Sequence, residues 1–439
     1  MKRQRWNSEW GFLLAAVGSA VGLGNIWRFS YLAYAHGGGA FLVPYCIALL
    51  TIGIPLLILE FGAGHEREGS APLVFAKISR DWEWLGWWAV VMVMFGIMLY
   101  YSTIISWCLN YLFLSFGLNW GDDPNTFFFK EFLQVSDSPA DFDSLRLPIL
   151  LGLVVIWLSC WIIVRRGIQS GIELANRILM PLLLLLTIIM TIWATTLEGS
   201  MTGLRAYLEP DFSRMTDPQV WIDAYSQIFF TLSLGFGIMI TYASYLPEKS
   251  NLTKTALITV LLNSGYSILA GCGVFAILGF MAESQHKEIA DVVSQSIGLA
   301  FVVYPKALNL IPGGNLFGVI FFFCLVIAGL SSAVSIIEVF IAAMIDKFGF
   351  SRPHLASILC LSGLLGSAVF ATQAGLHWLD IADHFITHYG LVSIGFFECI
   401  VIAWIFNLAT LRDHINQISS FKLGQGWSKI VQFVTPAAL

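Results

Sequence analysis

The sequence predicts an all-α polytopic membrane protein whose two halves form an inverted repeat, and three observations predict it. Hydrophobic residues make up 57% of the 439-residue chain and charged residues only 12%, about half the charged fraction of a soluble domain. Apolar runs recur along the whole chain at about 20 residues each, the length that spans a bilayer core as a helix. Two of these runs are interrupted at their centres by glycines in matching positions.

The apolar segments are continuous rather than alternating, which selects helices over a closed barrel. We expect ten complete spans near residues 10–35, 39–63, 84–116, 148–165, 171–196, 219–245, 252–282, 314–345, 353–373 and 381–411. An eleventh begins near Trp427 and stops at Leu439. We therefore expect the hydrophobic part of the natural chain to continue.

Lysine and arginine in the short loops predict the orientation, because such residues accumulate on the cytoplasmic side. They lie before the first span and in every second loop after it: Lys2, Arg3 and Arg5; Arg67, Lys77 and Arg80; Arg165 and Arg166; Lys249 and Lys254; Lys347 and Arg352; Arg412 and Lys422. All of these loops fall on one side of the membrane. The amino terminus is therefore expected in the cytoplasm.

Other features give weaker information. The seven cysteines are scattered through apolar runs without CxxC spacing, so neither a disulfide framework nor a metal site is expected. The outer segment from Ala282 to Asn315 is moderately apolar. It forms either a surface helix pair or a cap that dips toward an outer vestibule.

The two interrupted spans are the most informative feature. Span one contains GSAVGLGN from Gly18 to Asn25, and span six contains TLSLGFG from Thr231 to Gly237. Glycine weakens a helix interior, and spans that lie five apart cross the membrane in opposite directions. Close packing through small residues would explain one such motif, but two matched breaks beside Asn25, Thr231 and Ser233 indicate a transport site. Unwound carbonyls can hold a cation and half-helix amino ends favour an anionic group, so an amino-acid carboxylate beside sodium fits both.

The runs WNSEWGFLLAAVGSAVGLGNIWRF, GGGAFLVPY and QIFFTLSLGFG resemble the neurotransmitter:sodium symporter family, which has the LeuT fold. The resemblance covers essentially the whole chain, and the motifs look most like those of a bacterial transporter of many hydrophobic amino acids. It implies a LeuT-type 5+5 inverted repeat with discontinuous helices 1 and 6. Residues 1–196 would form the first five-helix repeat, 197–411 the second, and 412–439 a cytoplasmic loop and the start of helix 11. A bacterial inner (plasma) membrane is the implied location.

The resemblance also implies two bound sodium ions. The first would be held, together with the substrate carboxylate, by Ala20, Asn25, Thr231 and Asn263. The second would be held by Gly18, Val21, Ala328, Ser331 and Ser332. Neutral oxygens of this kind suit a hard monovalent cation, whereas a carboxylate-rich cage would favour calcium.

A substrate pocket between the two breaks is implied as well. Its residues would be Ala20, Gly22, Leu23, Gly24, Ile97, Tyr101, Phe230, Thr231, Ser233, Phe236, Ser332 and Ile336. Monoamine carriers of the family have aspartate at the position of Gly22, so glycine there implies substrates that bring their own carboxylate. The apolar pocket positions imply hydrophobic or aromatic L-amino acids.

Gates and a charge-compensating site complete the implied machinery. Arg28 and Asp383 match the outer gate, and the inner gate is matched by Arg3, Trp6, Ser244, Tyr245 and Asp346. The positions of a chloride site or of a buried carboxylate pair are matched by Tyr45, Gln227, Ser267, Glu60 and Glu398. Whether chloride or a proton supplies the negative charge stays open at this point.

The chain has no GxSxG or HExxH motif, and HGGG from His36 to Gly39 alone does not predict an enzyme. The expected function is a sodium-coupled importer of hydrophobic L-amino acids that works by alternating access. The alternative is a proton-coupled amino acid permease of a related inverted-repeat fold, which would lack the Ser331–Ser332 site or place a base there. No nucleic-acid partner is expected, and the oligomeric state is left open.

Overall fold

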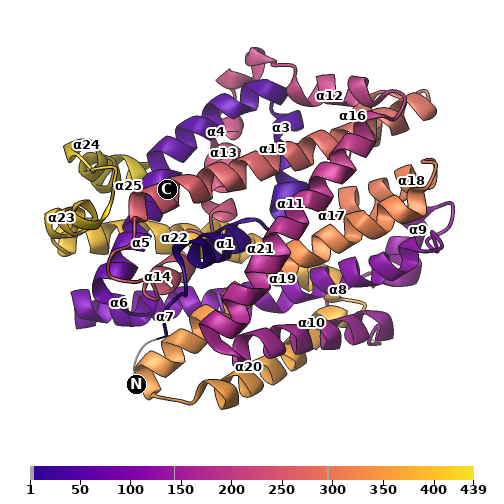
Figure 1. Ribbon diagram of the computed structural model, residues 1–439. Coiled ribbons are helices and arrows are strands. Elements are labelled where there is room, and N and C mark those ends of the chain that lie inside the picture. The colour runs from indigo at the N-terminus through magenta and orange to yellow at the C-terminus, as the bar shows by residue number, and fades with distance from the viewer. Residues whose placement is uncertain (1–3, 143, 294–295) are drawn as a thin grey trace.

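A computed structural model describes residues 4–142, 144–293 and 296–439 of the chain and confirms the all-helical fold class. Within these residues no β-strand is found, and one isolated β-bridge joins Leu145 to Thr372. Figure 1 shows the helices packed into a single bundle with α1 (Glu9–Ala20) near its centre.

Eight helical segments of the described chain are long and apolar enough to cross a membrane. They are Gly38–Arg67, Arg80–Ser115, Leu147–Arg165, Ile168–Thr195, Leu252–Ser284, Gly314–Phe348, Arg352–Ala371 and Gly375–Ile405. These segments contain the helices α5 (Ile54–Arg67), α8 (Met98–Ser115), α11 (Leu174–Thr195), α15 (Leu252–Ser284), α19 (Gly314–Phe348), α21 (Gly375–Phe385) and α22 (Val392–Ile400). These segments cover eight of the ten spans expected from the sequence.

The other two expected spans are the glycine-interrupted ones. The first consists of α1, α2 (Leu23–Ile26) and α3 (Arg28–Ala35), and its two arms meet at an angle of 69°. The second consists of α13 (Pro218–Thr231) and α14 (Ile238–Ala243), which are separated by the non-helical residues 232–237. Each half is shorter than a bilayer-spanning helix. A count of uninterrupted helices therefore falls below ten.

The second half of the second broken span, α14, lies directly against α5. A Cβ atom added to Gly64 of α5 would lie 2.0 Å from the backbone oxygen of Ile240. Any larger residue would push the two helices apart, so glycine is what allows their backbones to touch. This contact places α5 beside the unwound segment.

Within the outer segment for which two alternatives were expected, the stretch Leu299–Leu308 is mostly buried, whereas residues 283–291 are mostly exposed. The outer segment forms α16 (Ile289–Val292) and a helical stretch that ends in α18 (Tyr304–Leu308). Phe301 is fully buried, and its ring centroid lies 6.3 Å from that of Trp27 beside the first break. This stretch therefore packs beside the first broken span.

The carboxyl-terminal helices α23 (Leu408–Ile418), α24 (Gln425–Lys429) and α25 (Thr435–Ala438) stand together at one side of the bundle, in yellow in Figure 1. Residues 425–438 are helical without interruption, which agrees with an eleventh span that starts near Trp427. The α23 helix buries Leu408, Leu411 and Ile415.

Candidate functional site

The first break is held open by a side chain. Val21 donates the last backbone hydrogen bond of α1 to Val17, and the next amide, that of Gly22, donates to Asn25 Oδ1 at 2.8 Å. Two hydroxyl groups from other elements approach the carbonyl of Ser19: Ser233 Oγ at 3.1 Å and Ser332 Oγ at 3.3 Å. The break therefore presents backbone oxygens to groups outside the helix.

The second break depends on residues in the left-handed region of backbone space. Gly235 and Gly237 have φ of 74° and 71°, and Ser233 has φ of 53°. The left-handed region is open to glycine and costs free energy for serine. Glu60 of α5 accepts the freed amide of Gly235 at 2.9 Å, so a buried carboxylate replaces the missing helical acceptor.

Asn25 joins the two breaks. Its amide nitrogen, which carries two N–H donors, lies 2.9 Å from Thr231 Oγ1, 2.9 Å from Asn263 Oδ1 and 2.8 Å from Ser267 Oγ. All four side chains are almost completely buried. Neutral oxygens from the first break, the second break and α15 thus converge on one point, which is the ligand set that a hard monovalent cation requires.

A second group of oxygens lies where α1 meets α19. Ser332 Oγ lies 3.4 Å from the carbonyl oxygen of Gly18 and 3.3 Å from that of Ala328. Ser331 Oγ donates to the Ala328 carbonyl at 2.9 Å. Four of the five residues expected at the second sodium site are therefore linked by direct contacts, and no such contact involves the fifth, Val21.

A cavity lies between the two breaks and is lined by residues of both. All twelve residues expected at the substrate site line it, namely Ala20, Gly22, Leu23, Gly24, Ile97, Tyr101, Phe230, Thr231, Ser233, Phe236, Ser332 and Ile336. A Cβ atom on Gly22 would lie 3.2 Å from both Ser332 Oγ and the Tyr101 hydroxyl. Gly22 therefore faces the cavity, and any side chain there would enter it.

The sequence missed two residues of this cavity, Ser19 and Ile238. Ser19 lies inside the GSAVG motif, and its hydroxyl is buried without a hydrogen-bond partner. Its position between two expected residues was a usable signal. Ile238 begins α14 only after the chain has turned through Gly237, so its direction could not be read from helical spacing.

Gln227 lines the same cavity as Asn25, and Tyr45 contacts the residue after Asn263, so both lie near the Asn25 cluster. Both polar side-chain atoms of Gln227 are buried without a hydrogen-bond partner, and Tyr45 bonds to Ser264 Oγ at 3.0 Å. Unsatisfied buried amides are costly. This group is therefore a candidate site for an anion.

The buried carboxylates Glu60 and Glu398 lie within electrostatic range of one another, on α5 and α22. Glu60 Oε2 and Glu398 Oε1 have no hydrogen-bond partner although both side chains are completely enclosed. Two such groups cannot both be ionised at low cost. The pair is therefore a candidate for a shared proton.

The two outer-gate residues are not paired with each other. Arg28 Nη2 donates to Ser226 Oγ at 3.1 Å, and its guanidinium lies 5.4 Å from the Phe230 ring centroid. Asp383 on α21 accepts a hydrogen bond from the Tyr100 hydroxyl at 2.7 Å. No direct ion pair joins Arg28 to Asp383 in the described chain.

The expected inner-gate residues lie in closely packed, hydrogen-bonded surroundings. Trp6 is buried, and its backbone amide and indole nitrogen donate to the carbonyls of Tyr245 at 3.0 Å and Tyr242 at 2.8 Å. Asp346 accepts from the Ser70 amide at 2.8 Å, and the Ser244 hydroxyl donates to Thr241 within α14. Arg3 lies outside the described residues.

Comparisons with known proteins agree with this geometry. A model of the Sodium:neurotransmitter symporter family matches residues 3–125 and 120–439. An uncharacterized sodium-dependent transporter of Methanocaldococcus jannaschii is 48% identical over 441 residues, which cover 100% of this chain and 89% of that protein. The sodium- and chloride-dependent taurine transporter of Bos taurus is 34% identical over 478 residues, covering 99% and 76% of the two chains.

The crystal structure of MhsT in complex with L-phenylalanine has the same fold. It superposes with a TM-score of 0.83 at 33% sequence identity, covering 99% of this chain and 98% of that one. Identity at this level over the full length supports a common arrangement of the broken helices.

Proposed function

The chain belongs to the sodium:neurotransmitter symporter family, a family of sodium-dependent membrane transporters and not of enzymes, and from this we propose that it imports hydrophobic and aromatic L-amino acids together with two sodium ions. The observation that carries the proposal is the cavity between the two breaks, because its walls combine backbone oxygens, the Asn25 cluster and apolar side chains. One ligand with a carboxylate and an apolar side chain fits all three.

At the first sodium site we assign Asn25, Thr231 and Asn263, with the carbonyl of Ala20 and the substrate carboxylate. The support is the convergence of neutral oxygens around Asn25 at 2.8–2.9 Å. A carboxylate shared by sodium and protein makes the two binding events mutually dependent. Each ligand must then raise the affinity for the other by the same factor.

At the second sodium site we assign the carbonyls of Gly18, Val21 and Ala328 with the hydroxyls of Ser331 and Ser332. The oxygen cluster between α1 and α19 supports this assignment. An ion there would join the first broken span to α19. Sodium would thus stabilise one arrangement of those two elements and change the populations of the transport states.

For the substrate, we assign its carboxylate to the first break and the Tyr101 hydroxyl, and its side chain to the apolar wall. Ile97, Phe236 and Ile336 line the cavity, and Phe230 forms its outer boundary beneath Arg28. The MhsT structure holds L-phenylalanine, a ligand of the same chemical class. The absence of a side chain at Gly22 leaves room for the substrate carboxylate.

We further propose that chloride is a co-ion. The buried donor group of Gln227, Tyr45 and Ser267 contains no carboxylate, and both polar atoms of Gln227 lack partners. A relative that is named sodium- and chloride-dependent shares 34% identity. An anion at this place would offset the charge of the first sodium ion, whereas the Glu60–Glu398 pair beside the Gly235 amide would share a proton.

Transport would proceed by alternating access across a bacterial inner membrane, with the amino terminus in the cytoplasm. In the present conformation the inner residues Trp6 and Tyr245 are in contact, while Arg28 and Asp383 lie within electrostatic range but bond to Ser226 and Tyr100 and not to each other. Closure of this outer pair over bound substrate would give the occluded state. The opening of α1 away from α14 would then release sodium and substrate inward.

The deciding experiment measures uptake of radiolabelled phenylalanine and leucine into proteoliposomes under an inward sodium gradient. We expect uptake with sodium and none when potassium replaces it at equal ionic strength. Uptake that persists with a proton gradient alone would instead support the rival function, a proton-coupled permease of a related inverted-repeat fold.

A further inference from the structure

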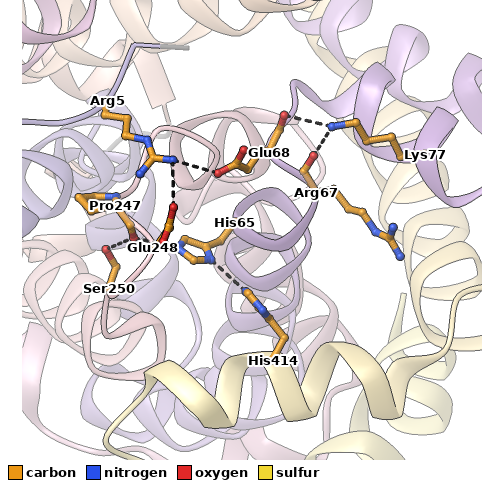
Figure 2. A network of polar contacts seen from close by, with 9 residues as sticks. All are labelled: Arg5, His65, Arg67, Glu68, Lys77, Pro247, Glu248, Ser250 and His414. Carbon is orange, nitrogen blue, oxygen red and sulfur yellow. Dashed lines mark hydrogen bonds and ion pairs between the residues drawn. The ribbon is translucent and has the colours of Figure 1, made fainter. Parts of the chain in front are cut away.

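Two histidines meet on the face of the bundle that carries the amino terminus. His65 lies at the end of α5 and His414 lies on α23, 349 residues later, yet His65 Nδ1 and His414 Nε2 are 3.0 Å apart. His65 Nε2 lies 3.0 Å from the carbonyl oxygen of Pro247, in the turn that follows α14. Figure 2 shows this chain of contacts from α23 through α5 to that turn.

The Pro247 contact fixes the protonation pattern of the neutral pair. A carbonyl oxygen only accepts, so His65 Nε2 carries a proton and donates it to Pro247. His65 Nδ1 is then an acceptor, and His414 Nε2 must donate to it. Both neutral rings therefore hold their single proton on Nε2. Each hydrogen bond in the chain is then donated in the direction from His414 to Pro247.

This chain of contacts holds the inner half of the second broken span. On α5, Glu60 accepts the amide of Gly235 in the unwound segment before α14, and His65 donates to the Pro247 carbonyl in the turn after α14. Tyr245, two residues before Pro247, carries the carbonyl that accepts from Trp6. A change at His65 thus reaches the element on which the closed inner side depends.

The α23 helix is joined to the bundle by both apolar and polar contacts. Ile415 packs so closely on α5 that a Cβ atom on Gly62 would lie 2.5 Å from its Cδ1. Beyond the helix, the side chain of Asn251 bonds with Ser420. The His65–His414 contact is the polar tie between α23 and α5 in this region, and it is the one that can titrate near neutral pH.

Other charged groups surround the pair. Arg5, Glu68 and Glu248 face His65, and Arg5 is itself paired with Glu68 at 3.2 Å and with Glu248 at 4.0 Å. On α23, Arg412 and Asp413 pair with each other at 3.4 Å. Arg5 offsets only one of the two glutamates, so the surrounding groups leave one net negative charge, and only the second proton added to the pair introduces net positive charge.

The physical consequence is a contact that weakens on acidification. Burial, with a smaller contribution from the His65 ring, holds the pKa of His414 below its ordinary value. One added proton on His414 Nδ1 leaves the bond intact, but a second must go to His65 Nδ1, where two N–H groups would then face each other. The separated histidines bind protons near pH 6.5, so the released state holds more protons and gains stability as the pH falls.

We propose that His65, His414 and the Pro247 carbonyl form a proton-sensitive latch that ties α23 to the inner half of the second broken span and opens when the cytoplasm acidifies. The structural part concerns only docking of α23 and the turn after α14. Its consequence, faster opening of the inner side at low cytoplasmic pH, rests on the proposed transport function.

Hydrogen exchange of the full-length protein tests the structural part. Peptides covering residues 408–418 and 238–250 are compared at pH 7.5 and pH 5.5 after correction for the intrinsic pH dependence of exchange. We expect corrected exchange at least tenfold faster at pH 5.5 in both peptides. His414→Gln, whose amide can donate or accept, should abolish this increase in exchange at low pH. His354→Gln, at a histidine that hydrogen-bonds to Ser351, should retain the increase.

Equal corrected exchange of the wild-type peptides at the two pH values would overturn the latch, whatever the variants do. An increase in corrected exchange at pH 5.5 that persists in His414→Gln would also overturn the latch. Sodium-driven uptake at pH 7.5 on both sides is measured in parallel on the same preparations. Absence of that uptake in the wild type would contradict the proposed function. The conclusion about the docking of α23 would not be affected.

Discussion

Asn25 and Thr231 are 206 residues apart in the sequence, yet Asn25 Nδ2 donates to Thr231 Oγ1 over 2.9 Å in the buried centre of the protein. This contact joins the first glycine break to the second. Asn25 also bonds within its own break, through Oδ1 and the Gly22 amide. One side chain therefore holds the first break open and fixes it to the second.

Asn25→Ala should weaken sodium and substrate binding together. The substitution leaves buried partners unsatisfied, at a cost of about 2 kcal/mol, or roughly thirtyfold in affinity. Phenylalanine binding measured over a range of sodium concentrations checks this expectation. Asn110→Ala, on α8 and bonded only to nearby backbone carbonyls, is the control, and loss of only one of the two affinities would contradict a shared site.

Ser332→Ala should raise the sodium concentration needed for half-maximal uptake by about tenfold, because a hydroxyl ligand is worth about 1–1.5 kcal/mol. Ser335→Ala provides a matched control one turn away on α19. Ser335 donates to the Ser331 carbonyl and accepts from Tyr242, without contact to α1. An equal effect of both substitutions would mean that Ser332 only packs the two helices together.

Gly22→Ala should lower substrate affinity by at least tenfold while the protein still folds. The added Cβ would lie 3.2 Å from two groups that border the cavity, Ser332 Oγ and the Tyr101 hydroxyl. Gly265→Ala on α15 is the control, since its Cβ would meet nothing within 4 Å. Unchanged phenylalanine affinity in Gly22→Ala would show that the substrate carboxylate binds elsewhere.

Replacement of chloride by gluconate should reduce sodium-driven uptake at least severalfold. Ser267→Glu should make uptake independent of chloride, because a fixed carboxylate beside the Asn25 cluster would supply the negative charge. Ser267→Ala removes the same hydroxyl without adding charge and should stay dependent on chloride. Wild-type uptake that is equally fast in gluconate would contradict the anion site.

The positions of the spans could be predicted from the sequence because each depends on local composition. An apolar run of about 20 residues must become a helix in lipid wherever it lies, since no water is present to satisfy the backbone. The glycine breaks were also visible locally. The twelve cavity residues followed from the resemblance to a family whose motifs the chain shares, and the structure brings all of them to one cavity.

Contacts between distant elements could not be predicted in this way. The separation of Arg28 from Asp383 depends on the conformation adopted, and the burial of Phe301 depends on how an outer segment packs. The meeting of His65 and His414 could not be predicted, because neither residue lies in a motif. Their contact required α5 and α23 to pack together.

The sequence by itself therefore determined a helical membrane protein with two opposed glycine breaks, because hydrophobic length and backbone flexibility are properties of short segments. The tertiary structure alone decided which groups those breaks face. Asn25 reaches Thr231, Ser332 reaches Gly18, and His414 reaches His65. Each of these contacts depends on the relative position of two helices, which is set by packing along their whole length and not by the residues that finally touch.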